Sequence, residues 1–256
     1  RVCHLQPVDW SSGWPVMGNA GEPYWKFRKP KSDSKTIVNP VETDEFDSSK
    51  LGMQWQWQND YKESYGQATS MGFFRLFTYA LPELGDVSNL WYVPNMLLQK
   101  IPADEFTATT KLSFCSRNSD QYVGLVCMSA EYSSVGLQRT EDGYELQIRH
   151  NPNAMRTHLT DEVLTVDTLK PTQKGTPRKG RPAEMHIKDV YLRMSIKDSK
   201  VNYAYSIDGK KWKKAGGEYA MGKGRWIGSK IGFFAVDPNK TGRKGFIDID
   251  WFRISR

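Results

Sequence analysis

Two carboxylates near the end of the sequence have a spacing that could support acid–base chemistry. Asp248 and Asp250 stand two residues apart in a stretch that alternates polar and apolar residues. The residues around them, Ile247, Ile249 and Trp251, would form the opposite face of a strand. The two carboxyl groups would then lie about 7 Å apart and admit a water molecule, as hydrolysis with inversion requires. Paired acids on a closing strand are more often solvated or hydrogen-bonded, so we assign this pair no catalytic role.

The three cysteines form no metal-binding or disulfide pattern. Cys3, Cys115 and Cys127 are an odd number without a CxxC pair, which predicts neither a zinc site nor a disulfide framework. If residues 111–115 and 122–128 form a hairpin, Cys115 lies near its turn and Cys127 far from it. We therefore expect free thiols.

Other common active-site patterns are absent from the sequence. The four histidines have no metal-ligand spacing, and there is no Ser-His-Asp or Cys-His order, phosphate-binding loop or dinucleotide glycine pattern. We expect no required cofactor.

The net charge of +7 does not indicate a nucleic-acid partner. Much of the excess lies in one Pro- and Gly-rich stretch without aromatic residues, where a nucleic-acid surface would interleave them on a folded face. We interpret this stretch as a solvated loop. No apolar run reaches 18 residues, so we expect no membrane partner. The basic residues are Lys170, Lys174, Arg178, Lys179, Arg181 and Lys188.

Period-2 alternation dominates the sequence and predicts an all-β fold. In residues 190–196, for example, Val190, Leu192 and Met194 alternate with polar residues, as in a half-buried strand. Residues 89–101 could hold one helical turn before Pro102, and little else is helical. Many short strands separated by turn signals are typical of a sandwich or barrel. The predicted strands are 105–115, 122–128, 135–140, 144–149, 190–196, 201–205, 230–236 and 246–254.

The composition divides the chain near residue 43. Lys, Pro, Ser and Asp replace the aromatic-rich opening between residues 26 and 42, which is typical of a linker. We predict an extended appendage over residues 1–43 and a compact domain over residues 44–256.

Four stretches, in order, carry a resemblance to a known family: residues 43–57, residues 89–100 with 106–112, residues 203–212 and residues 245–253. Together they resemble the C-terminal concanavalin A-like domain of family 43 glycoside hydrolases of the β-xylosidase or α-L-arabinofuranosidase type. The resemblance implies a sandwich of two antiparallel sheets with Phe46, Trp55 and Trp57 in its core. Residues 1–18 are similar to the last strand and exit loop of the catalytic β-propeller in these enzymes.

The resemblance also implies that the catalytic residues belong to a different domain. Inverting hydrolysis of xylosyl or arabinosyl linkages would use carboxylates of a propeller that precedes Arg1, so this chain would carry no catalytic residue. Arg1 would stand where the family keeps a sugar-binding arginine. Trp226 would lie on a loop that reaches the substrate pocket, with core packing as the alternative. The implied partners are the propeller of the same parent chain and a xylo- or arabino-oligosaccharide, in an extracellular or periplasmic location.

A structural calcium ion is a further expectation for a carbohydrate-binding sandwich. Asp44, Glu45, Asp248 and Asp250, from the first and last predicted strands, offer the oxygen ligands that Ca²⁺ prefers. The alternative is that these are surface acids paired with the backbone or with Arg253.

Three functions remain open from the sequence. An accessory domain that packs on a propeller predicts exposed apolar residues among Trp10, Trp14, Trp25 and Trp226. An independent carbohydrate-binding module for xylan or arabinoxylan requires a platform of exposed aromatic rings. A purely structural β-domain requires neither.

Overall fold

A computed structural model describes residues 4–31, 33, 36, 39–81, 89–156, 159–179, 181–224, 228–239 and 242–256. Contacts divide the chain into two units, Arg1–Asn39 and Pro40–Arg256. The division falls within the stretch whose composition predicts a linker. No described helix is long and apolar enough to cross a membrane.

The first unit contains a short hairpin formed by β1 (Val8–Asp9) and β2 (Val16–Met17). The Asp9 carboxylate accepts hydrogen bonds from the backbone N–H and the hydroxyl of Ser11, both at 2.9 Å, which closes the loop between the strands. The side-chain amide of Gln6 bonds the backbone of Tyr24 in both directions. Among the described residues of this unit none is buried, so the contacts that hold them are local and polar.

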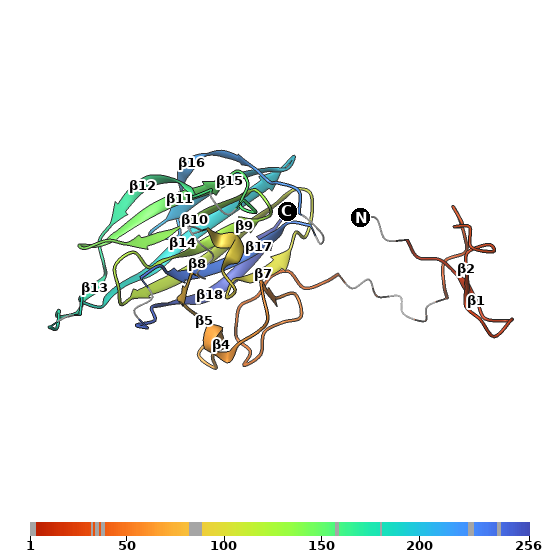
Figure 1. The fold of residues 1–256 in the computed structure, drawn as a ribbon, viewed down its shortest axis with the longest axis horizontal. Coiled ribbons are helices and arrows are strands. Elements are labelled where there is room, and N and C mark those ends of the chain that lie inside the picture. The colour runs from red at the N-terminus through yellow and green to blue at the C-terminus, as the bar shows by residue number, and fades with distance from the viewer. Residues whose placement is uncertain are drawn as a thin grey trace. The chain divides into compact units, whose positions relative to one another are not determined.

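The second unit is a sandwich of two sheets, as Figure 1 shows. The first sheet has the order β12 (Glu162–Leu169), β11 (Tyr144–Asn151), β10 (Tyr132–Arg139), β9 (Tyr122–Met128), β17 (Lys230–Asp237), β7 (Leu97–Lys100), β3 (Gln56–Trp57), with β6 (Tyr79–Ala80) alongside β17. The second sheet has the order β16 (Lys213–Ala220), β15 (Lys200–Ser206), β14 (Met185–Lys197), β8 (Phe106–Ser116), β18 (Phe246–Ser255), β5 (Phe74–Phe77), β4 (Gly66–Ala68), with β13 (Gln173–Lys174) alongside β14. The predicted all-β sandwich is confirmed.

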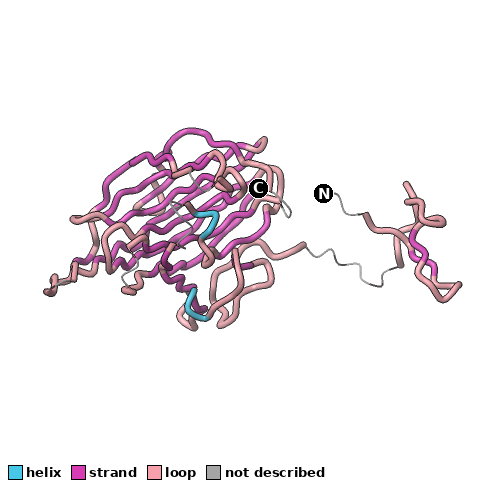
Figure 2. Tube along the Cα trace, viewed as in Figure 1, coloured by secondary structure: helices cyan, strands magenta, loops and turns pink. Residues whose placement is uncertain are grey.

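Helical structure in the described residues is limited to two short turns, which stand out in Figure 2. The turn Leu90–Tyr92 lies within the stretch where one turn is predicted. The Asn89 side chain caps it by accepting a hydrogen bond from the Trp91 backbone N–H. The other turn is Glu63–Tyr65.

The main core lies between the two sheets and is built by alternation along each strand. Phe233 of β17 and Leu125 of β9 face it from the first sheet, and Phe114 of β8 and Ile249 of β18 face it from the second. A second apolar cluster covers the other side of the first sheet, where Phe234 packs with residues of the 89–96 segment. Because both faces of β9 are covered, all seven of its residues are buried.

All eight predicted strands are present, whereas the edge strands β12 and β16 and the short strands between residues 66 and 100 were not predicted. Residues 122–128 coincide with β9, and the bounds of the other seven predicted strands differ from the observed bounds by one to five residues at one end or at both. The short strands β5 and β7, which lie inside the sheets, were also missed, and β7 falls in the stretch where a helical turn is predicted. The missed strands β12 and β16 end the first and second sheets. Most of their residues are exposed or partly exposed, so their sequences carry no clean apolar alternation.

Two expectations about strand geometry are wrong. Strand β18 has a bulge between Ile249 and Trp251, so Phe252 enters the core while Trp251 turns outward beside Tyr191. The hairpin of residues 111–115 with 122–128 does not form, because β8 and β9 belong to different sheets. The free thiols of Cys115 and Cys127 are confirmed.

Candidate functional site

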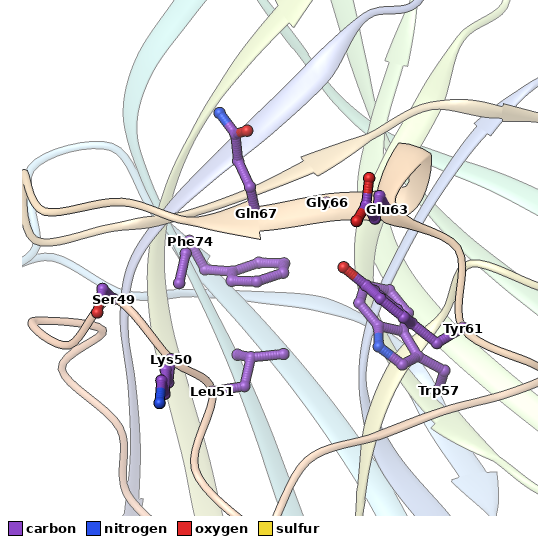
Figure 3. A pocket seen from close by; sticks show the side chains of 10 residues that line it. Ser49, Lys50, Leu51, Trp57, Tyr61, Glu63, Gly66, Gln67 and Phe74 are labelled. Atoms are coloured by element: carbon purple, nitrogen blue, oxygen red, sulfur yellow. The ribbon is translucent and has the colours of Figure 1, made fainter.

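An open pocket of about 570 Å³ lies at the end of the sandwich, where residues 49–51 meet strands β3, β4 and β5 (Figure 3). Gly66 shapes its wall, because a Cβ there would lie 2.6 Å from the Arg75 carbonyl oxygen and 2.9 Å from the Phe74 ring. The absence of a side chain therefore lets β4 approach Phe74 closely. The pocket is lined by Ser49, Lys50, Leu51, Trp57, Tyr61, Glu63, Gly66, Gln67, Ala68 and Phe74.

Two aromatic rings form one side of this pocket. The ring centroids of Trp57 and Tyr61 are 5.7 Å apart with 34° between the planes, and 58% of Tyr61 is exposed. Tyr65 supports Trp57 with a centroid distance of 5.6 Å. Figure 3 shows Trp57 and Tyr61 side by side, with Phe74 and Leu51 across from them. Such rings offer apolar faces on which the C–H face of a sugar can stack.

Polar groups at the rim complete the pocket. Glu63 lies at the Tyr61 end, Ser49 and Lys50 lie at the opposite end, and the Gln67 amide points away from the rings. Among the described residues that line this pocket, Glu63 is the one carboxylate. This lining does not supply the pair of carboxylates that inverting hydrolysis requires.

The predicted acid pair of β18 is engaged in ion pairs. Asp248 receives two hydrogen bonds from Arg75, at 2.7 and 2.8 Å. Asp250 pairs with Lys111 at 2.6 Å, and Lys111 also contacts Asp189 at 2.8 Å. Hydrogen bonds to Asp189 and Asp250 raise the pKa of the Lys111 ammonium above its usual range. Both acids thus serve as counter-ions that join neighbouring strands of the second sheet.

Asp44 organises the entry of the chain into the sandwich. Its carboxylate accepts hydrogen bonds from the Phe46 backbone N–H at 2.8 Å, the Trp55 indole at 2.7 Å and the Gln54 amide at 3.2 Å. Its backbone forms a bridge to Phe252. Phe46 and Trp55 are buried in the core as expected, whereas Trp57 is only partly buried and opens to the pocket.

Glu45 lies next to Asp44 and forms a two-point ion pair with Arg253, at 2.7 and 2.8 Å. Hydrogen bonding from Arg253 lowers the pKa of the Glu45 carboxyl. Both groups are about half exposed. This is the pairing with Arg253 that the sequence offers as the alternative to calcium binding.

The four acids proposed as calcium ligands do not fit a shared ion. Ca²⁺ takes six to eight oxygens that converge on one point. No three of Asp44, Glu45, Asp248 and Asp250, all among the described residues, bring ligand atoms within 4.8 Å of one another. Each already has a partner in the chain. A different group does converge within that distance, namely Cys115, Glu184 and His186.

Comparison with known families decides the affiliation of the sandwich. The family model of the β-xylosidase C-terminal concanavalin A-like domain matches residues 43–255. The chain belongs to this family. The resemblance read from residues 43–57, 89–112, 203–212 and 245–253 is thereby confirmed.

Relatives of this family 43 domain are larger hydrolases. A β-xylosidase of Formosa agariphila is 28% identical over 97% of the chain and 41% of its own length. A non-reducing end α-L-arabinofuranosidase of Bacteroides ovatus is 23% identical over 81% of the chain and 35% of its own length. The chain therefore spans less than half the length of these relatives.

Solved structures share the fold of the family 43 domain. A GH43 protein of Bacillus licheniformis gives a TM-score of 0.67 at 23% identity and covers 97% of the chain and 46% of its own. A xylan β-1,4-xylosidase of Bacillus halodurans gives 0.68 at 18% identity and covers 98% and 46%.

Arg1 and Trp226 lie outside the described residues. The three other tryptophans expected to form an apolar patch are exposed, at 64% for Trp10, 73% for Trp14 and 99% for Trp25.

The pocket of Trp57 and Tyr61 was not predicted from the sequence. Its signal is the aromatic spacing Trp57, Tyr61 and Tyr65, which places rings four residues apart in a segment without strand alternation. The sequence around Trp57 predicts a core strand instead, and the neighbouring Trp55 is indeed buried.

Proposed function

We propose that this chain is the accessory C-terminal sandwich of a glycoside hydrolase acting on xylosyl or arabinosyl linkages. In this proposal it packs on a catalytic β-propeller of the same parent chain and shapes the substrate pocket, while the propeller supplies the carboxylates. The observation that carries the proposal is the family match over residues 43–255. The chain also covers less than half the length of its relatives, which are larger hydrolases.

Two features of the structure support an accessory role. The acids of β18 are engaged by Arg75 and Lys111, so neither is free to act as a proton donor. The first unit exposes Trp10, Trp14 and Trp25, and large exposed apolar side chains mark surfaces that contact another domain or ligand.

The accessory role predicts no hydrolysis by the isolated chain. Purified residues 1–256 are expected to release no p-nitrophenol from p-nitrophenyl β-D-xyloside or α-L-arabinofuranoside, because the paired acids are counter-ions. Protein from the complete parent gene is expected to cleave at least one of them. If the isolated chain hydrolyses either substrate and Asp248→Asn abolishes that activity, the proposal is contradicted and the acids of β18 are catalytic.

A second candidate function, independent carbohydrate binding, is favoured by the pocket of Trp57 and Tyr61. The two rings provide a partly exposed aromatic surface, and Glu63 and Lys50 offer hydrogen-bonding groups at its rim. Xylo-oligosaccharides, with repeated apolar ring faces and hydroxyl edges, match this combination.

This second function predicts that xylotetraose binds to the isolated chain and that Tyr61→Ala weakens binding about tenfold, the effect of losing roughly 1.4 kcal/mol of stacking. Isothermal titration calorimetry measures the affinity. Tyr24→Ala is the matched control, since Tyr24 is also exposed but lies in the first unit. No heat with the unaltered chain, or an equal loss in both variants, would rule the pocket out.

A further inference from the structure

Cys115, Glu184 and His186 lie together at one end of the second sheet. Cys115 of β8 is the direct cross-strand partner of His186 of β14. Glu184 stands two residues before His186, immediately ahead of β14, so the two side chains share a face. The intervening Met185 and the following Ile187 point into the core, which directs His186 and Glu184 to the outer face.

The cysteine is sheltered without being part of an apolar core. Cys115 is 2% exposed yet belongs to neither apolar cluster of the sandwich. Its cross-strand partner on β18 is Phe246, and the Arg75 guanidinium lies 3.9 Å from the centre of that ring. The thiol is therefore covered on one side and faces His186 and Glu184 on the other.

The distances among the three ligand atoms suit a small tetrahedral cation. Cys115 Sγ lies 3.5 Å from His186 Nε2, and this nitrogen lies 2.9 Å from Glu184 Oε1. Around Zn²⁺, with bonds of about 2.3 Å to sulfur and about 2.0 Å to nitrogen and oxygen, the separations are about 3.5 Å and about 3.3 Å. A shift of a few tenths of an ångström at the Glu184 carboxylate is sufficient.

A neighbouring arginine holds the carboxylate in place. Arg117 Nε donates to Glu184 Oε2 at 2.7 Å, which leaves Oε1 directed at His186. A hydrogen bond to a metal-binding side chain orients that side chain and tunes its affinity for the metal. The Glu184 and His186 side chains are 39% and 28% exposed, so an ion and one water molecule can reach the site from solvent.

The types of ligand select the class of cation. A thiolate, an imidazole and one carboxylate suit Zn²⁺ or Co²⁺, whereas Ca²⁺ and Mg²⁺ require more oxygen ligands. We propose that Cys115, His186 and Glu184 form a Zn²⁺-binding site, with water in the fourth position, that joins β8 to β14. Binding displaces the thiol proton of Cys115, because the thiolate is the ligand.

Cobalt titration under reducing conditions tests the site, since Co²⁺ bound by a thiolate has a near-ultraviolet charge-transfer band. The chain is expected to bind one equivalent with this band. Cys115→Ser is expected to abolish the band. His186→Gln is expected to weaken binding by at least about 100-fold, since removing a ligand costs more than removing a group that only orients one. Zn²⁺ is expected to displace the Co²⁺, whereas Ca²⁺ in excess is not.

The two other cysteines supply the matched controls. The double variant Cys3→Ser, Cys127→Ser must keep the band, because Cys127 lies in the first sheet and is not one of the three converging ligands. Circular dichroism of each variant distinguishes loss of a ligand from loss of fold. Absence of the band in the unaltered chain, its persistence in folded Cys115→Ser, or displacement by Ca²⁺ would overturn the site.

Discussion

Phe252→Ala is expected to lower the free energy of unfolding by about 3 to 5 kcal/mol, the usual cost of removing a buried phenylalanine ring. Phe252 is 0% exposed and makes edge contacts with the rings of Trp55 and Phe233, at centroid distances of 5.4 and 5.5 Å. Its loss leaves a cavity where the two sheets meet. Urea denaturation followed by tryptophan fluorescence measures the change.

The neighbouring Trp251 is the matched control for this prediction. Because the bulge turns Trp251 outward, it contacts Tyr191 and the Arg253 guanidinium instead of the core. Trp251→Ala is expected to cost about 1 kcal/mol or less, although a larger side chain is removed. The opposite order, with Trp251→Ala the more damaging change, would show that the strand follows regular alternation without the bulge.

Asp44→Ala is expected to destabilise the fold by about 2 to 4 kcal/mol. The substitution removes the acceptor for the Trp55 indole, the Phe46 backbone N–H and the Gln54 amide. Trp55 is 8% exposed, so its N–H would remain buried without this partner. Asp44→Asn, which keeps one acceptor oxygen, is expected to lose roughly half as much. Thermal and urea unfolding measure both variants.

Glu45 provides the control next to Asp44. Its ion pair with Arg253 is about half exposed, and Glu45→Ala is expected to cost less than about 1 kcal/mol. The calcium expectation makes the opposite prediction. If the acids held an ion, Ca²⁺ would raise the unfolding temperature and Glu45→Ala would abolish that increase. We expect no shift on adding Ca²⁺ or a chelator, because the four carboxylates do not converge.

These contacts link stability to the proposed function through the same segment. Asp44 pins the start of the compact unit to β18, and the chain then runs through Trp55 into Trp57 and the pocket. Destabilising the entry segment is therefore expected to disturb the Trp57 wall before the remote edge strands. Asp44→Asn is therefore expected to weaken sugar binding at the pocket, whereas Glu45→Ala is expected to leave sugar binding unchanged.

The sequence by itself determined the fold class and the family. Apolar alternation marks interior strands because each buries one face, and β9, β14 and β17 lie where this pattern predicts. The alternation of these strands depends on residue type and short-range spacing, which the sequence contains directly. The burial of Phe46 and Trp55 followed from the family resemblance. The free thiols of Cys115 and Cys127 were expected from a hairpin that does not form, so that outcome did not depend on the pattern used to predict it.

Only the tertiary structure decided the features that depend on pairing across long separations. The bulge in β18 cannot be seen in the sequence, since Trp251 and Phe252 are both apolar and either could face the core. Cys115 and His186 are 71 residues apart and meet only because β8 pairs with β14. Strand register is set by the packing of whole sheets, so one bulge or one pairing decides which side chains meet.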